Sequence, residues 1–114
     1  MCRHNILAHH EQGYVVFCKG CGRYQLAFGT SLTTLEPADY DRFCEQVAGL
    51  EKCNRQKQGA ENCKKIYLDV YCTHAMMVLS IKELKSLNAL LDEADFNRQV
   101  GFLLQESHIK SPEN

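Results

Sequence analysis

The chain has 114 residues, 45% of them hydrophobic, and a formal net charge of -1 at pH 7. This length suits one compact domain with a small core, and the nearly balanced charge gives no global attraction to nucleic acid or anionic membranes. No apolar run approaches the ~20 residues of a membrane span, and no hydrophobic signal region follows the polar N-terminus. We therefore expect a cytoplasmic protein with no membrane contact.

Seven cysteines fit a reducing compartment, because an odd number cannot close completely into disulfides. Cys44 falls on the apolar face of an expected helix, where cysteine most often behaves as a small hydrophobic residue. We expect free thiols at Cys53 and Cys63, which flank a polar segment. The sequence leaves open whether these two residues form a second metal site with Cys72 and His74.

The first third of the chain is expected to be mostly β-structure. Residues 1–12 are interpreted as an irregular or short helical arm. Two apolar runs, 14–18 and 23–28, are expected to form the arms of a hairpin joined by a glycine-rich turn. The run 31–35, rich in threonine and leucine, is expected to add another strand.

A helix is then expected to begin at Pro37, because proline needs no amide partner in the first turn and carboxylates favour the positive end of the helix dipole. Apolar residues three or four positions apart are expected to form the buried face of this helix. The residues are Tyr40, Phe43, Val47 and Leu50. From Glu51 to Lys65 the polar composition indicates an exposed loop.

The second half predicts strands at 66–71 and 75–79, followed by a helix. Ser80 and Glu83 have the spacing of a capping box, in which a hydroxyl and a carboxylate each satisfy a free amide. The expected buried stripe is Leu84, Leu87, Leu90, Leu91 and Ala94. A last helical segment is expected to run to Glu106, with its apolar side at Phe96, Val100, Leu103 and Leu104. Residues 1–106 would form one domain, with 107–114 as a polar tail.

The two halves align at an offset of 44 residues, which places Tyr24 on Leu68, Leu35 on Leu79 and Tyr40 on Leu84. Both halves then consist of two strands and a helix, so they are candidate repeats. The predicted fold is α+β, with the strands in one antiparallel sheet and the helices packed on one face.

The strongest chemical signal is the pair of cysteines in the hairpin turn, Cys18 and Cys21. Cysteines at this spacing can give two thiolates to one metal ion, and Cys2 and His4 are the nearest candidates for two further ligands. Three thiolates and one imidazole suit a closed, tetrahedral, structural Zn²⁺ site. His9 or His10 in place of His4 remains an alternative.

A family resemblance accompanies this pattern. The residues that carry it are Cys2 and His4, the runs 13–16 and 25–30, and Cys18 and Cys21. They resemble a small family of uncharacterised bacterial proteins with a domain of unknown function, which spans most of the chain. The family pattern pairs the Cys-x-His start with the Cys-x-x-Cys knuckle, which implies shared ligation and brings no activity with it. Zinc ribbons have a similar knuckle, but they normally add a second ligand pair from another hairpin.

Two enzymatic interpretations are weaker. Cys2 as an N-terminal nucleophile needs a longer chain, and a zinc-bound thiolate would be unavailable for attack. A redox dithiol normally lies at a helix start, whereas Cys18 and Cys21 lie between two expected strands.

The expected function is a non-enzymatic, zinc-binding domain that acts as a protein-interaction or regulatory module, with a protein partner or as a homodimer. The alternative is a zinc-knuckle protein that binds nucleic acid through basic residues around the central loop. Those residues are Lys52, Arg55, Lys57, Lys64 and Lys65.

Overall fold

The computed structural model describes residues 4–55, 66–70 and 75–108, with side chains up to residue 101. Four strands come first: β1 (His4–His10), β2 (Gly13–Cys18), β3 (Arg23–Phe28) and β4 (Ser31–Leu35). They are followed by α1 (Pro37–Asn54), β5 (Ile66–Asp69), β6 (Met76–Leu79) and α2 (Ile81–His108). The elements confirm the predicted α+β class.

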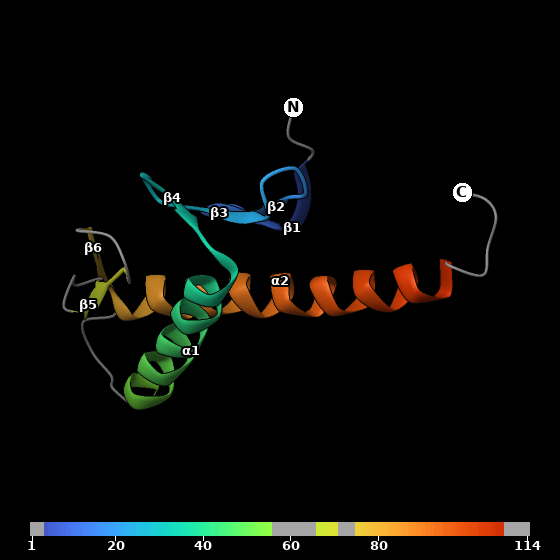
Figure 1. Ribbon diagram of the computed structural model, residues 1–114. Coiled ribbons are helices and arrows are strands. Elements are labelled where there is room, and N and C mark those ends of the chain that lie inside the picture. Colours follow the sequence, from blue (N-terminus) through green and yellow to red (C-terminus); the bar gives the residue numbers. More distant parts are fainter. Residues whose placement is uncertain (1–3, 56–65, 71–74, 109–114) are drawn as a thin grey trace.

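The first four strands form an antiparallel sheet in the order β1-β2-β3-β4, and both helices lie on one face of it (Figure 1). Side chains from this face of the sheet and from the helices form one apolar core, which includes Val15, Leu26, Phe43 and Leu87. The strands β5 and β6 pair only with each other among the described residues, so the expectation of a single sheet was wrong.

The strand β1 replaces the irregular or helical arm that the sequence indicated at residues 1–12. It pairs with β2 through a β-bulge, since Ile6 lies opposite Val16 and Ala8 opposite Val15, which leaves Leu7 as the extra residue. The side-chain amide of Asn97 on α2 donates a 2.6 Å hydrogen bond to the carbonyl of Leu7. The helix thereby satisfies a carbonyl at the point where the strand pairing is interrupted.

The helix α1 begins at Pro37 as predicted, and the Glu36 carbonyl accepts the first helical hydrogen bond, from the Tyr40 amide. The helix is longer than expected, because residues 51–54 continue it and do not belong to a loop. Glu51 is buried and forms an ion pair with Arg55, one turn further on, at 2.8 Å. This pair adds a few tenths of a kcal/mol to the last turn of the helix, about what an i,i+4 ion pair contributes.

The capping box of α2 is confirmed. The Ser80 amide donates to the Glu83 carboxylate at 2.9 Å, and the Glu83 amide donates to the Ser80 hydroxyl at 3.1 Å. All five residues of the predicted stripe from Leu84 to Ala94 are buried. The helix then continues without a break to His108, past the expected end at Glu106.

The apolar side predicted for the last helical segment is not part of the core. Phe96 is 65% exposed and Val100 is half-buried, while the side chains of Leu103 and Leu104 lie outside the described part of the chain. The next two residues, Asn97 and Arg98, still bond to β1 and β3, so Phe96 is exposed because it lies on the side of α2 that faces away from the sheet. Further along the chain, α2 extends past the edge of the sheet (Figure 1).

The structure agrees with the offset of 44 residues in the order and position of the strands and helices. The pairing of the strands within the two hairpins differs. Adding 44 places the start of α1 on the start of α2 and places β4 on β6. In the first unit Tyr24 pairs with Leu35, but Leu79, the equivalent of Leu35, pairs with Ile66 and not with Leu68. The two hairpins therefore differ in register by two residues.

Neither helix, over the residues that the structure describes, has the combination of length and apolar character that a membrane-spanning helix needs.

Candidate metal centre

The turn between β2 and β3 is folded around the sulfur of Cys18. The Gly22 amide donates a 2.8 Å hydrogen bond to the Cys18 carbonyl, and Gly22 has φ 72°, a left-handed conformation that glycine adopts without strain. The Cys21 amide points at the Cys18 sulfur at 3.4 Å. An N–H directed at sulfur stabilises a thiolate, so this turn is prepared for a charged cysteine.

His4 lies directly across from Cys18 in the β1-β2 ladder. Directly opposed residues share a face of the sheet, with their Cβ atoms about 5 Å apart. This face is turned away from the helices, because Val15 and Phe17, on alternate positions of β2, contribute to the core. The backbone thus brings His4 and Cys18 to one end of the outer face of the sheet, where the turn that contains Cys21 begins.

The strand register also distinguishes His4 from the two other histidines of β1. His9 pairs with Tyr14 and His10 with Gly13, at the opposite end of the strand from Cys18. Five residues of extended strand separate His4 from His9, which corresponds to about 17 Å. His10 is bonded to Glu93 on α2 at 2.7 Å. Of the three histidines of β1, His4 is the one that lies nearest the knuckle.

Arg23 lies opposite Cys18 in the ladder between β2 and β3, and its charge is paired with that of Glu36. The Arg23 guanidinium donates a 2.7 Å hydrogen bond to the Glu36 carboxylate. This bond raises the pKa of Arg23, and the sulfurs of Cys21 and Cys18 raise it further.

No three His, Cys, Asp or Glu side chains converge closely enough to hold a metal ion within the ranges 4–55, 66–70 and 75–108. Cys18 is only 2% exposed, whereas Cys21 and His4 are exposed. Cys2, the fourth expected ligand, lies outside these ranges, two residues before His4. The described backbone therefore gathers three of the expected ligands without closing their side chains around one point.

The other cysteines have different surroundings. Cys44 packs against the core as expected, and burial raises the pKa of its thiol to about 11. Cys53 is an exposed free thiol on α1. Cys63, Cys72 and His74 lie outside the described residues, so a second metal site with Cys53 stays untested.

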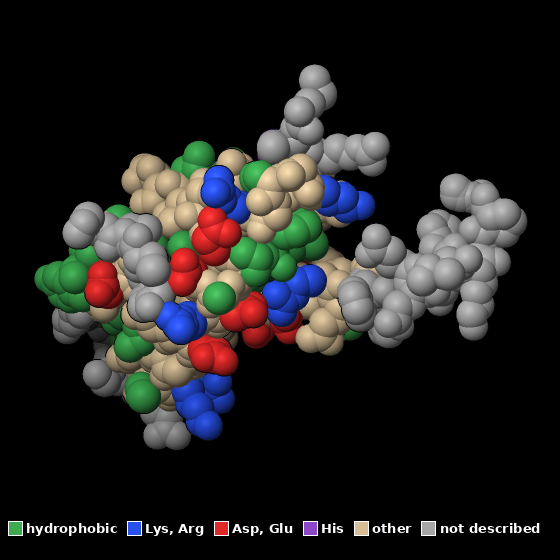
Figure 2. All heavy atoms as spheres, viewed as in Figure 1, with side chains coloured by type: hydrophobic (Ala, Val, Ile, Leu, Met, Phe, Trp, Pro, Cys, Tyr) green, Lys and Arg blue, Asp and Glu red, His purple; other side chains and the backbone are tan. Residues whose placement is uncertain are grey.

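The basic residues of the nucleic-acid alternative are only partly described. Lys52 is exposed near the end of α1, and Arg55 is neutralised by Glu51. Lys57, Lys64 and Lys65 fall outside the described ranges. On the face shown in Figure 2, basic and acidic side chains are interspersed and do not gather into a basic patch.

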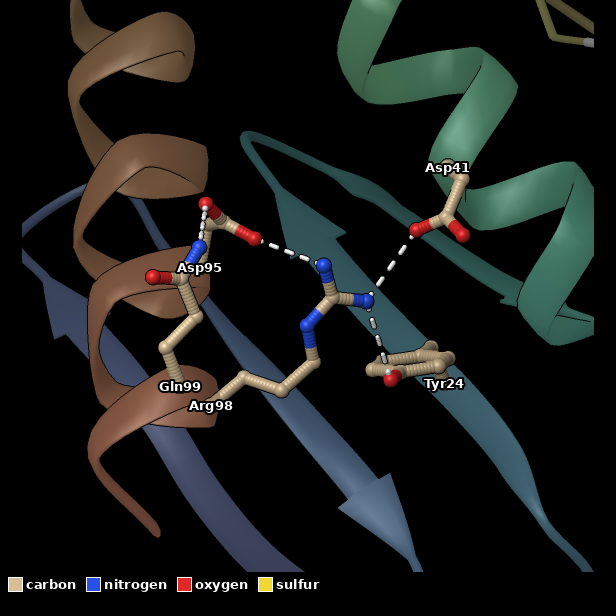
Figure 3. A network of polar contacts seen from close by, with 5 residues as sticks. All are labelled: Tyr24, Asp41, Asp95, Arg98 and Gln99. Carbon is tan, nitrogen blue, oxygen red and sulfur yellow. Dashed lines mark hydrogen bonds and ion pairs between the residues drawn. The ribbon is translucent and has the colours of Figure 1, made fainter. Parts of the chain in front are cut away.

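A polar network that sequence reasoning missed is centred on Arg98 of α2 (Figure 3). Its guanidinium donates to the Tyr24 hydroxyl at 3.3 Å, to Asp41 at 3.1 Å and to Asp95 at 2.6 Å. Asp95 also accepts a hydrogen bond from Gln99. Only the Asp95 contact, three residues away, follows a helical spacing, while the other two link α2 to β3 and α1. We interpret the network as a clamp that fixes the helices against the sheet.

Two stacked tyrosines beside this network provide a matched pair for mutation. The rings of Tyr24 and Tyr40 lie 4.1 Å apart and nearly parallel. The Tyr24 hydroxyl bonds to Arg98, whereas the buried Tyr40 hydroxyl makes no well-formed hydrogen bond among the described residues and interacts with the Cys44 thiol, a weak partner. Burial also raises the pKa of Tyr40.

Replacing Tyr24 with phenylalanine is expected to lower the free energy of unfolding by about 1 kcal/mol, because Arg98 loses a partner. Tyr40→Phe is expected to be neutral or to stabilise by up to about 1 kcal/mol, because it removes a desolvated hydroxyl whose interaction is with a thiol, a weak hydrogen-bond partner. Urea unfolding of the two variants measures both effects. Equal losses in the two proteins would contradict the assigned difference between the hydroxyls.

The fold and the knuckle together define a class: a small α+β domain with a Cys-x-x-Cys turn on the open face of an antiparallel sheet. The chain belongs to the family of unknown function DUF6686, whose model matches residues 1–112. No curated protein and no solved structure matches the chain. The family assignment agrees with the resemblance to a domain of unknown function.

Proposed function

We propose that the protein binds one Zn²⁺ ion through Cys2, His4, Cys18 and Cys21, and that this ion is structural. The observation that carries the proposal is that His4 lies directly across the ladder from Cys18. Cys18 is the first cysteine of the turn, and the Cys21 amide points at the Cys18 sulfur. These residues are soft sulfur and imidazole ligands, which zinc prefers.

A site of this kind fills the tetrahedral shell of zinc with protein ligands and leaves no open position for a substrate or an activated water. We therefore propose a non-enzymatic role. The ion would join the beginning of β1 to the turn between β2 and β3, and its binding energy would add to the stability of a sheet whose outer face neither α1 nor α2 covers.

As its mode of action we propose contact with another protein, either a different chain or a second copy. Apolar side chains on the outer face of the β5-β6 hairpin support this proposal. They are Tyr67, Met76 and Val78, each at least 40% exposed. Exposed apolar side chains grouped on one face are typical of protein contacts. No observation in the described residues favours nucleic acid.

The metal proposal is tested by the zinc content of the purified chain and of two histidine variants. The wild type is expected to contain one equivalent of zinc by elemental analysis. His4→Asn is expected to lose most of it during dialysis against a chelator, because it lacks one ligand. His9→Asn is the matched control, since His9 is exposed on the same strand and face.

A wild-type chain without bound metal after expression in zinc-supplemented medium contradicts the proposal. Equal zinc retention by His4→Asn and the wild type would exclude His4 as a ligand. Substitution with Co²⁺ gives a second readout, because tetrahedral thiolate coordination produces intense visible absorption that the His9→Asn variant should retain.

A further inference from the structure

The solvent-facing side of α2 carries a stripe of charged and apolar residues. The stripe consists of Lys82, Lys85, Ala89, Asp92 and Phe96, all of them exposed. Their spacing alternates between three and four residues, which is the spacing by which two helices pack side by side. The helix α2 is the longest of the described elements and extends past the sheet (Figure 1). The stripe is therefore a long surface that a second helix can approach.

The charges on this stripe do not stabilise α2 itself. Lys82 and Lys85 are three residues apart, a spacing at which like charges repel each other on a helix surface. Both lie near the positive end of the helix dipole, where a carboxylate is favoured instead. Lys85 acts electrostatically on Glu51, but that carboxylate is already bonded to Arg55. Within the described residues, neither lysine nor Asp92 forms an ion pair, so all three charges are available to a partner.

A second copy of the stripe complements the first when the two helices run in opposite directions. The lysines lie at one end of the stripe, Asp92 and Phe96 at the other, and Ala89 between them. Rotation by 180° about an axis through Ala89 places Lys85 of each copy beside the turn from Asp92 to Phe96 of the other copy. The ammonium group then meets the carboxylate, and the apolar stem of the lysine lies over the aromatic ring.

We propose that the chain forms a symmetric dimer through this stripe, with α2 of one copy packed antiparallel on α2 of the other. A parallel pair would place lysine against lysine and aspartate against aspartate, so the charges select the antiparallel pair. A different partner would need the reversed order of charges, which a second copy supplies by symmetry. The dimer covers Phe96, which is 65% exposed in the single chain. This inference goes beyond the proposed function, because it uses neither the zinc site nor the β5-β6 hairpin.

The interface makes quantitative demands on three exposed residues. One helix stripe is at the small end of specific interfaces, so we expect a dissociation constant on the order of 10 μM. Lys85→Glu and Asp92→Lys should each raise this constant about tenfold, because each change occurs twice in the dimer and replaces an attraction with a repulsion. Phe96→Ser should weaken the dimer as well, since it removes both rings. All three residues are exposed, so the variants should keep the fold, which circular dichroism checks.

Sedimentation equilibrium of the full chain, from about 1 μM to about 1 mM, measures the association. The decisive sample is an equimolar mixture of Lys85→Glu and Asp92→Lys. Each variant alone should associate weakly, but the mixture should form a heterodimer about as stable as the wild-type dimer. In that heterodimer, each carboxylate meets a lysine of the other copy. The chain that carries both substitutions should form a homodimer again for the same reason.

Two control variants change comparable residues outside the stripe. Lys52→Glu reverses an exposed lysine on α1 and should leave the dimer unchanged. Tyr67→Ser removes an aromatic side chain from the β5-β6 hairpin that is also 65% exposed, and it should likewise leave the dimer unchanged. A wild-type chain that stays monomeric at the highest concentration would overturn the inference. The same follows from a dimer that both single charge reversals leave intact, or from a mixture of these two variants that does not associate.

Discussion

Replacement of Cys18 by serine is expected to abolish zinc binding and to destabilise the fold more than any other single change at the knuckle. Cys18 is the residue on which the turn is built, since its carbonyl accepts from Gly22 and its sulfur from the Cys21 amide. A ligand that binds only the folded state adds about 4 kcal/mol when its free concentration is a thousand times its dissociation constant. A loss of this order is expected in urea unfolding with zinc present.

Two comparisons isolate the contribution of the metal. Cys53→Ser changes an exposed cysteine on α1 and is expected to keep both zinc and stability. Because Cys18 is also buried, the wild type and Cys18→Ser should be compared again after chelation, when most of the difference between them should disappear. A Cys18→Ser protein that retains its zinc and its unfolding midpoint would contradict the proposed ligand set.

The second large effect is expected at Gly13, where β2 begins. A Cβ atom at this position would lie 2.0 Å from the carbonyl oxygen of Ala27 and 2.9 Å from its carbon, both in the backbone of β3. A backbone in a paired strand cannot move away without loss of its hydrogen bonds. Gly13→Ala is therefore expected to lower the free energy of unfolding by about 3 kcal/mol, the upper part of the range for overpacked sites.

Gly49 offers the matched control for this substitution. It is an exposed position in α1, and a Cβ atom there would meet nothing within 4 Å. Gly49→Ala is expected to stabilise the protein by up to about 1 kcal/mol, because alanine has the higher helix propensity. Chemical denaturation of both variants measures the two effects. An unchanged unfolding midpoint for Gly13→Ala would show that β2 and β3 do not approach each other so closely at this end.

The sequence predicted correctly those elements that depend on interactions between residues close together in the chain. The start of α1 follows from Pro37, and the start of α2 from the reciprocal bonds of Ser80 and Glu83. Both depend on residues within one turn of each other. The strand β1 was missed because its alternation is interrupted by a bulge at Leu7 and only Ala8 among its residues is fully buried. Its conformation depends on β2 and on Asn97, which is 90 residues away.

The candidate site was predictable in its residue types but not in its geometry. The spacing of Cys18 and Cys21 indicated a metal knuckle, and the ladder between β1 and β2 was needed to prefer His4 over His9 and His10. Arg23 stands two residues after Cys21 in the sequence, but its place directly across from Cys18 depends on the register of β2 and β3. Long-range register cannot be read from the spacing of residues within one segment.

X-ray absorption at the zinc edge of the purified wild-type protein tests the central claim most directly, because it reports the number and kind of atoms bound to the metal. We predict three sulfur ligands at about 2.3 Å and one nitrogen ligand at about 2.0 Å. A shell made only of nitrogen and oxygen atoms, or a protein that contains no zinc, would contradict the claim that Cys2, His4, Cys18 and Cys21 bind one structural ion.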